Sequence, residues 1–210
     1  MAYESFDLKE MSPACGAIIE GIDLSRDLTN LQFGEVHEAL LDRTVVVFKG
    51  QDLTPDQHVA FARRFGELQP SAVSGFEKST DSPEIDILEY DAGNPPHETL
   101  DLWHTDFAGM ECPAMGTVLY ARDIPPRGGD TIWVNMIAAY EALSDRMKKH
   151  LDGLWAYHDR FKAYDEHVRP ELWGKDHQAH LRDRKATYTP ALHPVIRAHP
   201  VTGKRGLFVN

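Results

Sequence analysis

Short apolar runs, separated by glycine and proline at turn positions, constrain this 210-residue chain more than any other feature. Residues 44–48, Thr-Val-Val-Val-Phe, give the clearest example, because β-branched and aromatic side chains favour extended backbone. Further strands are predicted at residues 16–24, 84–90, 116–121, 131–134 and 154–158. A closing hairpin is predicted over residues 193–210, turned at Thr202-Gly203. A chain with this many short strands is expected to form a sheet-based fold.

Two segments carry the start signal of a capped helix. Thr29 with Gln32, and Thr54 with Gln57, match the pattern in which a threonine caps a helix and a glutamine three residues later bonds back. Two shorter helices are expected at 137–143 and 144–151. Strands and packed helices together predict a single domain over residues 1–210 that is mainly β with packed helices (α+β), specifically a jelly-roll β-sandwich.

Composition narrows the possible partners. The net charge of −11 argues against a nucleic-acid surface and against a polybasic membrane contact. The two cysteines form no CxxC motif, so a disulfide scaffold or a cysteine-based zinc site is not expected. We see no signal peptide and no apolar run of membrane-spanning length, so a cytoplasmic location is expected. Residues 160–190, crowded with charged side chains, are expected to form an insertion or lid.

One short motif, Trp103-His104-Thr105-Asp106, suggests metal chemistry. In an extended chain, residues i and i+2 point to the same side, so His104 and Asp106 would converge. A histidine and a carboxylate are two thirds of the 2-His-1-carboxylate triad that suits non-haem Fe(II). The motif is also common by chance, and a strand-end histidine beside a solvated aspartate is the alternative.

Other motifs follow one another in order along nearly the whole chain. They are Gly16-Ala17, Gly21-x-Asp23-Leu24, Val46-Val47-Phe48, Phe65-Gly66-Glu67-Leu68, Trp103-His104-Thr105-Asp106, Gly128-Gly129-Asp130-Thr131-x-Trp133, Ala138-Ala139-Tyr140-Glu141-Ala142-Leu143, Leu192-His193-Pro194-Val195-x-Arg197-x-His199-Pro200 and Leu207-Phe208-Val209-Asn210. On these motifs the sequence resembles the taurine/chlorophenoxyacetate dioxygenase family of Fe(II)- and 2-oxoglutarate-dependent oxygenases. The resemblance implies a double-stranded β-helix (jelly roll) that uses Fe(II), 2-oxoglutarate as co-substrate and O2.

The resemblance also implies roles for individual residues. His104 and Asp106 match two iron ligands, and Thr131 matches the threonine that bonds the 2-oxoglutarate carboxylate. No catalytic residue is expected beyond the metal ligands. The family's second iron histidine and its 2-oxoglutarate arginine lie beyond the segment matching 207–210. We therefore expect an N-terminal portion of a longer protein that lacks the last strands of the jelly roll.

Five positions match the family's substrate pocket: Ser71, Leu100, Phe107, Tyr164 and Phe208. For the three aromatic residues, core packing is an equal alternative. Ser71 replaces a taurine-binding histidine and Leu100 replaces an asparagine, so a substrate other than taurine is expected.

The expected function is hydroxylation of a small organic acid, namely a sulfonate, a sulfate ester or an aryloxy or carboxylic acid, with decarboxylation of 2-oxoglutarate to succinate. The expected assembly is a homo-oligomer, either a dimer or a tetramer. Alternatives are a non-catalytic jelly roll that binds a small acid or a metal, and an inactive truncated product. A zinc hydrolase would normally show more histidine ligands in a recognisable pattern.

Overall fold

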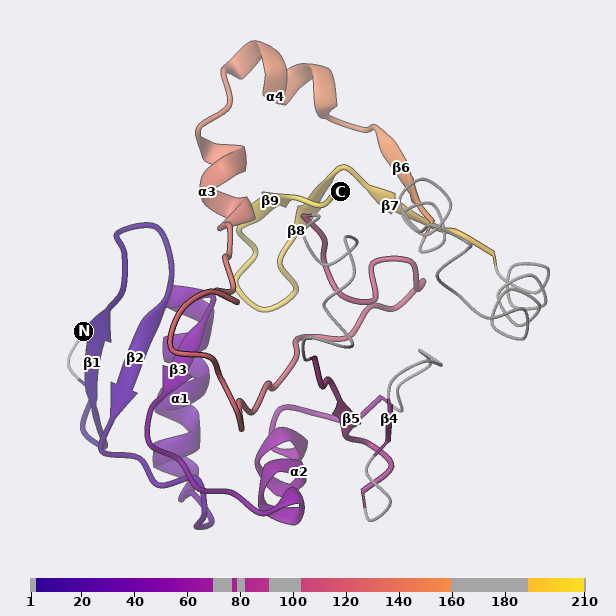
Figure 1. The fold of residues 1–210 in the computed structure, drawn as a ribbon. Helices are drawn as coiled ribbons and strands as arrows, with labels where there is room; N and C mark the ends of the chain where they lie inside the picture. The colour runs from indigo at the N-terminus through magenta and orange to yellow at the C-terminus, as the bar shows by residue number, and fades with distance from the viewer. Residues whose placement is uncertain (1–2, 70–76, 79–81, 91–102, 160–188, 210) are drawn as a thin grey trace, which may run out of the picture. The chain divides into compact units, whose positions relative to one another are not determined.

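The computed structural model describes residues 3–69, 77–78, 82–90, 103–159 and 189–209 (Figure 1). The chain divides into two units, one of Met1–Leu88 with Val118–Ala139 and one of Glu89–Thr117 with Tyr140–Asn210. Within the described residues, no helix has both the length and the apolar character that crossing a membrane requires.

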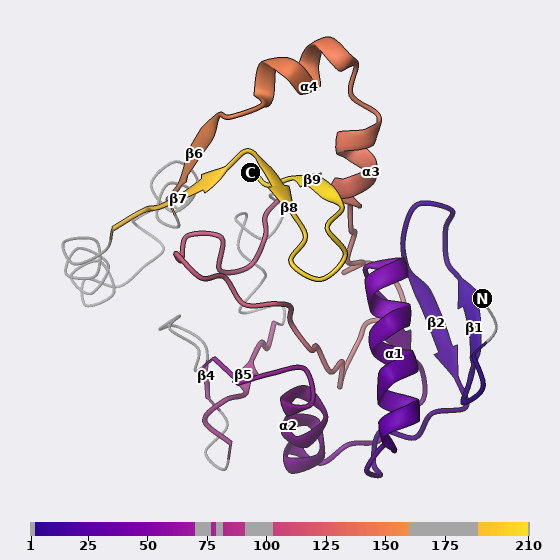
Figure 2. The same ribbon diagram turned by 180° about the vertical axis from the view of Figure 1, so that it is seen from behind.

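The first unit is built around a three-stranded sheet with the order β1-β2-β3. β1 (Asp7–Glu10) pairs antiparallel with β2 (Ala17–Glu20), and β2 pairs parallel with β3 (Val46–Phe48). The parallel pair is joined by helix α1 (Asn30–Arg43), which lies beside the strands in Figures 1 and 2. Gly16 has φ +84° in the connection between β1 and β2, where an added Cβ would lie 3.3 Å from the Met11 Cβ. Glycine is therefore required at this turn.

Both predicted capping boxes are present. The Thr29 side chain accepts a hydrogen bond from the Gln32 backbone N–H, and the Gln32 side chain accepts one from the Thr29 N–H. Thr54 and Gln57 make the same reciprocal pair at the start of α2 (Pro55–Arg63). Each box satisfies backbone donors that the first turn of a helix would otherwise leave without partners.

The core of this unit lies between the sheet and the two helices. Its buried members are Phe6, Ile19, Ile22, Leu24, Leu28, Val36, Ala39 and Phe61. The Phe61 ring meets Phe48 and Phe65 edge-on, with ring centroids 5.7 Å and 5.4 Å apart. Edge-to-face contacts of this kind add to the stabilisation that apolar burial provides.

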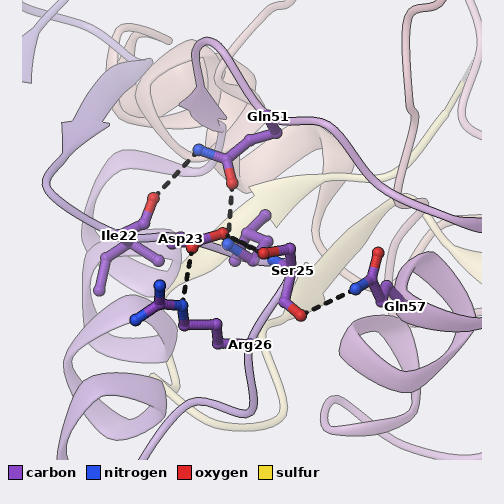
Figure 3. Close-up of polar contacts among 7 residues, drawn as sticks. Ile22, Asp23, Ser25, Arg26, Gln51 and Gln57 are labelled. Atoms are coloured by element: carbon purple, nitrogen blue, oxygen red, sulfur yellow. Dashed lines mark hydrogen bonds and ion pairs between the residues drawn. The ribbon is translucent and has the colours of Figure 1, made fainter.

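Glutamine side chains fix the loop that follows β2 (Figure 3). Gln51 donates from Nε2 to the Ile22 carbonyl at 3.0 Å and accepts from the Leu24 N–H at 2.8 Å. Gln57 donates from Nε2 to the Ser25 carbonyl at 2.9 Å. The amide side chains thus pair with backbone groups of a loop that has no strand partner of its own.

The second unit contains two antiparallel strand pairs. β6 (Trp155–His158) pairs with β7 (Ala191–Pro194), and β8 (Ile196–Ala198) pairs with β9 (Arg205–Leu207). The second pair is the predicted closing hairpin, and the Gly203 N–H bonds the His199 carbonyl across its turn at 2.8 Å. Helix α4 (Asp145–Leu151) also belongs to this unit, and α3 (Met136–Glu141) crosses the boundary between the two units in sequence. The short pair of β4 (Glu77–Lys78) and β5 (Asp86–Ile87) belongs to the first unit.

Helices and sheets occur together as expected, but several strand predictions were wrong. Residues 116–121 and 131–134 are described and form no strand, and the strand predicted over 84–90 is reduced to β5. β1 was not predicted, because its sequence Asp-Leu-Lys-Glu has little apolar character. A strand is completed by hydrogen bonds to a partner, which composition alone does not specify. The predicted insertion at 160–190 lies almost wholly outside the described residues.

Candidate functional site

The histidine and carboxylate of the Trp103–Asp106 motif lie side by side in the second unit. His104 Nε2 is 3.4 Å from Asp106 Oδ1, and the two side chains are 50% and 54% exposed. The segment forms no regular strand, and a turn begins at Asp106. The i, i+2 spacing nevertheless brings the two donor atoms together without regular strand structure.

A tight turn follows directly. The Ala108 N–H bonds the Thr105 carbonyl at 3.2 Å, and the Met110 N–H bonds the Phe107 carbonyl at 2.9 Å. Phe107 has φ +56°, a left-handed conformation that costs a residue other than glycine roughly 1–2 kcal/mol. This strained residue immediately follows the aspartate, so the surrounding contacts must hold the turn in place.

One of these contacts comes from β7. The His193 Nε2 lies 2.9 Å from the Met110 carbonyl oxygen. A carbonyl oxygen only accepts hydrogen bonds, so the Nε2 atom carries the proton and donates. His193 is 5% exposed, and this bond satisfies a polar atom that would be costly to bury alone.

The charge of Asp106 is stabilised within the same unit. A hydrogen bond from His104 lowers the pKa of the Asp106 carboxyl group, and one from Thr117 lowers it further against the opposing effect of partial burial. The Thr117 Oγ1 donates to Asp106 Oδ2 at 3.0 Å. Thr117 was not among the predicted site residues, since no pattern in the sequence marks it.

The pair fits the first two ligands of a divalent metal. An octahedral ion with ligands at about 2.1 Å holds neighbouring donor atoms about 3 Å apart, close to the observed separation. Imidazole nitrogen with carboxylate oxygen is also the donor set expected for non-haem iron. In the part of the chain that the structure describes, no cluster of three or more His, Cys, Asp or Glu side chains could hold a metal.

Thr131, the predicted 2-oxoglutarate residue, lies in the first unit and is exposed. It follows a turn in which Gly128 and Gly129 have φ +82° and +71°, as the predicted glycine turn requires. Of the predicted substrate positions, Ser71, Leu100 and Tyr164 lie outside the described residues.

The other two substrate positions are described in the second unit. Phe107 is half-buried in the turn described above. The Phe208 ring lies 5.1 Å from the rings of both His158 and His193, and the Arg197 guanidinium lies 4.8 Å above it. Phe208 thus takes part in a packed aromatic cluster, and a role for either phenylalanine in binding substrate stays a prediction.

Two further histidines of the second unit make contacts with backbone groups. His158 is 5% exposed, and its Nε2 lies 3.2 Å from the Phe208 carbonyl. The His199 Nδ1 accepts from the backbone N–H groups of Val201 and Thr202, each at 3.2 Å. The His158 contact joins the end of β6 to Phe208, and the His199 contacts lie in the β8–β9 turn.

Comparison with known sequences identifies relatives of the chain. The family described as "Taurine catabolism dioxygenase TauD, TfdA family" matches residues 7–210. The chain is 30% identical over 208 residues to the alpha-ketoglutarate-dependent sulfate ester dioxygenase of Pseudomonas putida, covering 96% of this chain and 65% of that protein. It is 30% identical over 217 residues to the alpha-ketoglutarate-dependent 2,4-dichlorophenoxyacetate dioxygenase of Cupriavidus pinatubonensis, covering 95% of this chain and 71% of that protein. The chain thus spans about two thirds of the length of these relatives.

Solved structures give a consistent result. A putative alpha-ketoglutarate-dependent taurine dioxygenase from Burkholderia xenovorans superimposes with a TM-score of 0.76 at 33% identity, over 97% of this chain and 65% of that chain. AAD-2, solved in complex with Mn(II) and N-oxalylglycine, superimposes with a TM-score of 0.73 at 25% identity, over 98% of this chain and 69% of that chain.

Proposed function

Because this chain belongs to the taurine catabolism dioxygenase TauD/TfdA family, we propose that the protein is an Fe(II)- and 2-oxoglutarate-dependent dioxygenase. The observation that carries the proposal is the 3.4 Å approach of His104 Nε2 to Asp106 Oδ1. Relatives whose names specify alpha-ketoglutarate-dependent dioxygenases align over more than nine tenths of the chain, which supports the same reading.

His104 and Asp106 would provide two iron ligands. Iron, when bound, would supply the activation of O2: one oxygen atom would enter succinate as 2-oxoglutarate loses CO2, and the other would hydroxylate the substrate. His104 would bind the metal in its neutral form, through the Nε2 that faces the carboxylate. Asp106 would bind through Oδ1 as a carboxylate, while its Oδ2 accepts the hydrogen bond from Thr117 Oγ1. The hydroxyl of Thr131 would donate a hydrogen bond to a 2-oxoglutarate carboxylate.

The proposed substrate is a small organic acid, namely a sulfonate, a sulfate ester or an aryloxy or carboxylic acid. Relatives named for sulfate esters and for 2,4-dichlorophenoxyacetate align at the same 30% identity, which supports the class without favouring one member. Ser71, Leu100, Phe107, Tyr164 and Phe208 are proposed to line the pocket. Among these, the apolar side chains of Leu100 and Phe107 would favour an apolar group attached to the acid.

For the fold, we propose that the strands belong to one jelly-roll domain over residues 1–210, with residues 160–190 as an insertion. Structural neighbours with TM-scores of 0.73 and 0.76 support this arrangement. We further propose that the protein assembles as a homodimer or homotetramer.

The test is anaerobic addition of Fe(II) and 2-oxoglutarate to the full-length protein, followed by visible absorption. We expect a weak charge-transfer band that His104→Ala and Asp106→Asn abolish and that His150→Ala, at an exposed position in α4, retains. Succinate release on admitting O2 would then be compared among an alkyl sulfonate, a sulfate ester and an aryloxyacetate. A full-length protein that gives no band, or a band that survives His104→Ala, would contradict the proposed function.

A further inference from the structure

Asp106 has a second partner besides His104, on its other carboxylate oxygen. Its Oδ1 faces His104 Nε2 at 3.4 Å, whereas its Oδ2 accepts a hydrogen bond from Thr117 Oγ1 at 3.0 Å. The two oxygens are therefore not equivalent in the folded chain. Thr117 lies eleven residues after Asp106, beyond the turn that follows the motif.

This asymmetry matters because a carboxylate rotates easily about its last torsion, and at other angles both oxygens, or neither, would face the metal. A hydrogen bond to one oxygen selects one orientation and leaves the other oxygen for a metal. We propose that Thr117 is a positioning residue that holds Asp106 with Oδ1 on the side of His104, so that the carboxylate binds metal through that single oxygen. This inference rests on the proposed function, because it takes His104 and Asp106 as the iron ligands.

The chemistry of threonine suits this task. Its hydroxyl is a donor, and its β-branched carbon restricts the first side-chain torsion, so the hydroxyl direction is restricted too. Valine has nearly the same shape but no donor, and serine has the donor without the branching. The pair Thr117→Val and Thr117→Ser therefore separates loss of the hydrogen bond from loss of packing.

The turn between the two residues is anchored independently. His193 holds the Met110 carbonyl at 2.9 Å, so the backbone after Asp106 is fixed by β7 as well as by Thr117. Removing the Thr117 hydroxyl should consequently free the carboxylate without unfolding the turn. We expect the variant to lose metal affinity rather than stability. Removing a contact that orients a metal ligand typically lowers metal affinity about 10–100-fold. Thr117 and Asp106 are both exposed, where water competes for the hydrogen bond, so the lower end of that range applies.

The experiment titrates the full-length protein with Co(II) under argon and follows the visible absorption of the bound ion, alongside thermal unfolding without metal. We expect Thr117→Val to weaken Co(II) binding about tenfold and to change the Co(II) spectrum, as a freed carboxylate alters the coordination. Thr117→Ser should restore most of the affinity. Thr202→Val, which removes a hydroxyl from the β8–β9 turn of the same unit, should bind Co(II) like the unaltered protein.

His104→Ala separates the two proposals. If His104→Ala binds Co(II) as tightly as the unaltered protein, the metal assignment itself is wrong. If His104→Ala abolishes binding but Thr117→Val binds as tightly as Thr117→Ser, the ligand pair stands and the positioning role is overturned. Equal losses of affinity in both Thr117 variants, with a lower unfolding temperature, would also overturn it, because they would indicate a structural role.

Discussion

The two units of this protein bury different kinds of side chain. In the first unit, the described interior is an apolar cluster in which residues such as Val36 and Ala39 are completely inaccessible to solvent. Among the described residues of the second unit, the buried side chains include those of His158 and His193, together with Ala108, Ala191 and Val195. The hydrophobic effect does not depend on the relative orientation of the buried groups, whereas a hydrogen bond requires a particular donor and acceptor in a defined geometry. The first unit is thus stabilised mainly by burial of apolar surface. The second depends more on specific hydrogen bonds near the proposed metal ligands.

The largest effect is expected from Phe61→Ala in the first unit. Phe61 is 8% exposed and is packed edge-on against Phe48 and Phe65. Truncation of such a ring should lower the free energy of unfolding by about 3–5 kcal/mol, from lost burial and the cavity left behind. Guanidinium denaturation followed by circular dichroism would measure it.

The matched control is Leu31→Ala in α1, where the side chain is 56% exposed. Its effect should stay within about 0.5 kcal/mol. Equal losses for Phe61→Ala and Leu31→Ala would break the comparison, because the first unit would then not depend on its apolar core.

An intermediate effect is expected from His193→Leu in the second unit. Leucine fills much of the space but cannot donate to the Met110 carbonyl, leaving a buried acceptor without its partner. The expected loss is about 1–3 kcal/mol. His150→Leu, at an exposed site on α4, serves as the control and should have little effect. An unchanged unfolding midpoint for His193→Leu would show that the second unit, too, is stabilised chiefly by apolar burial.

The features predicted correctly from the sequence are local ones. The capping boxes at Thr29 and Thr54 depend on residues three positions apart, and both formed as predicted. The turn at Thr202-Gly203 depends on one residue with positive φ, and Gly203 adopts φ +69°. The approach of His104 to Asp106 likewise follows from positions two apart in the sequence, although the segment forms no strand.

The features that were missed depend on distant partners. β1 exists because it pairs with β2, and its own composition gives no strand signal. Thr117 reaches Asp106 from eleven positions away, and His193 reaches Met110 from 83 positions away. Such contacts depend on the fold that brings the segments together, so no spacing rule could have identified them.

The smallest effect concerns an exposed polar contact in the first unit. The Glu35 carboxylate accepts hydrogen bonds from the backbone N–H groups of Glu4 at 2.7 Å and Ser5 at 2.9 Å. The bond from Glu4, followed by those from Ser5, lowers the pKa of Glu35 below its ordinary value of 4.5. A carboxyl group with a lowered folded-state pKa stabilises the protein above the ordinary pKa, and this contribution is lost as the pH falls through the lowered value. Glu35→Gln should therefore unfold at a slightly lower temperature than the unaltered protein at pH 7, with the two curves converging in acid. A temperature difference that persists unchanged at acid pH would mean that the charge of Glu35 contributes nothing. The stability of the first unit would then come from apolar burial, without a contribution from this surface charge. The difference from the second unit, which depends on specific hydrogen bonds, would be larger.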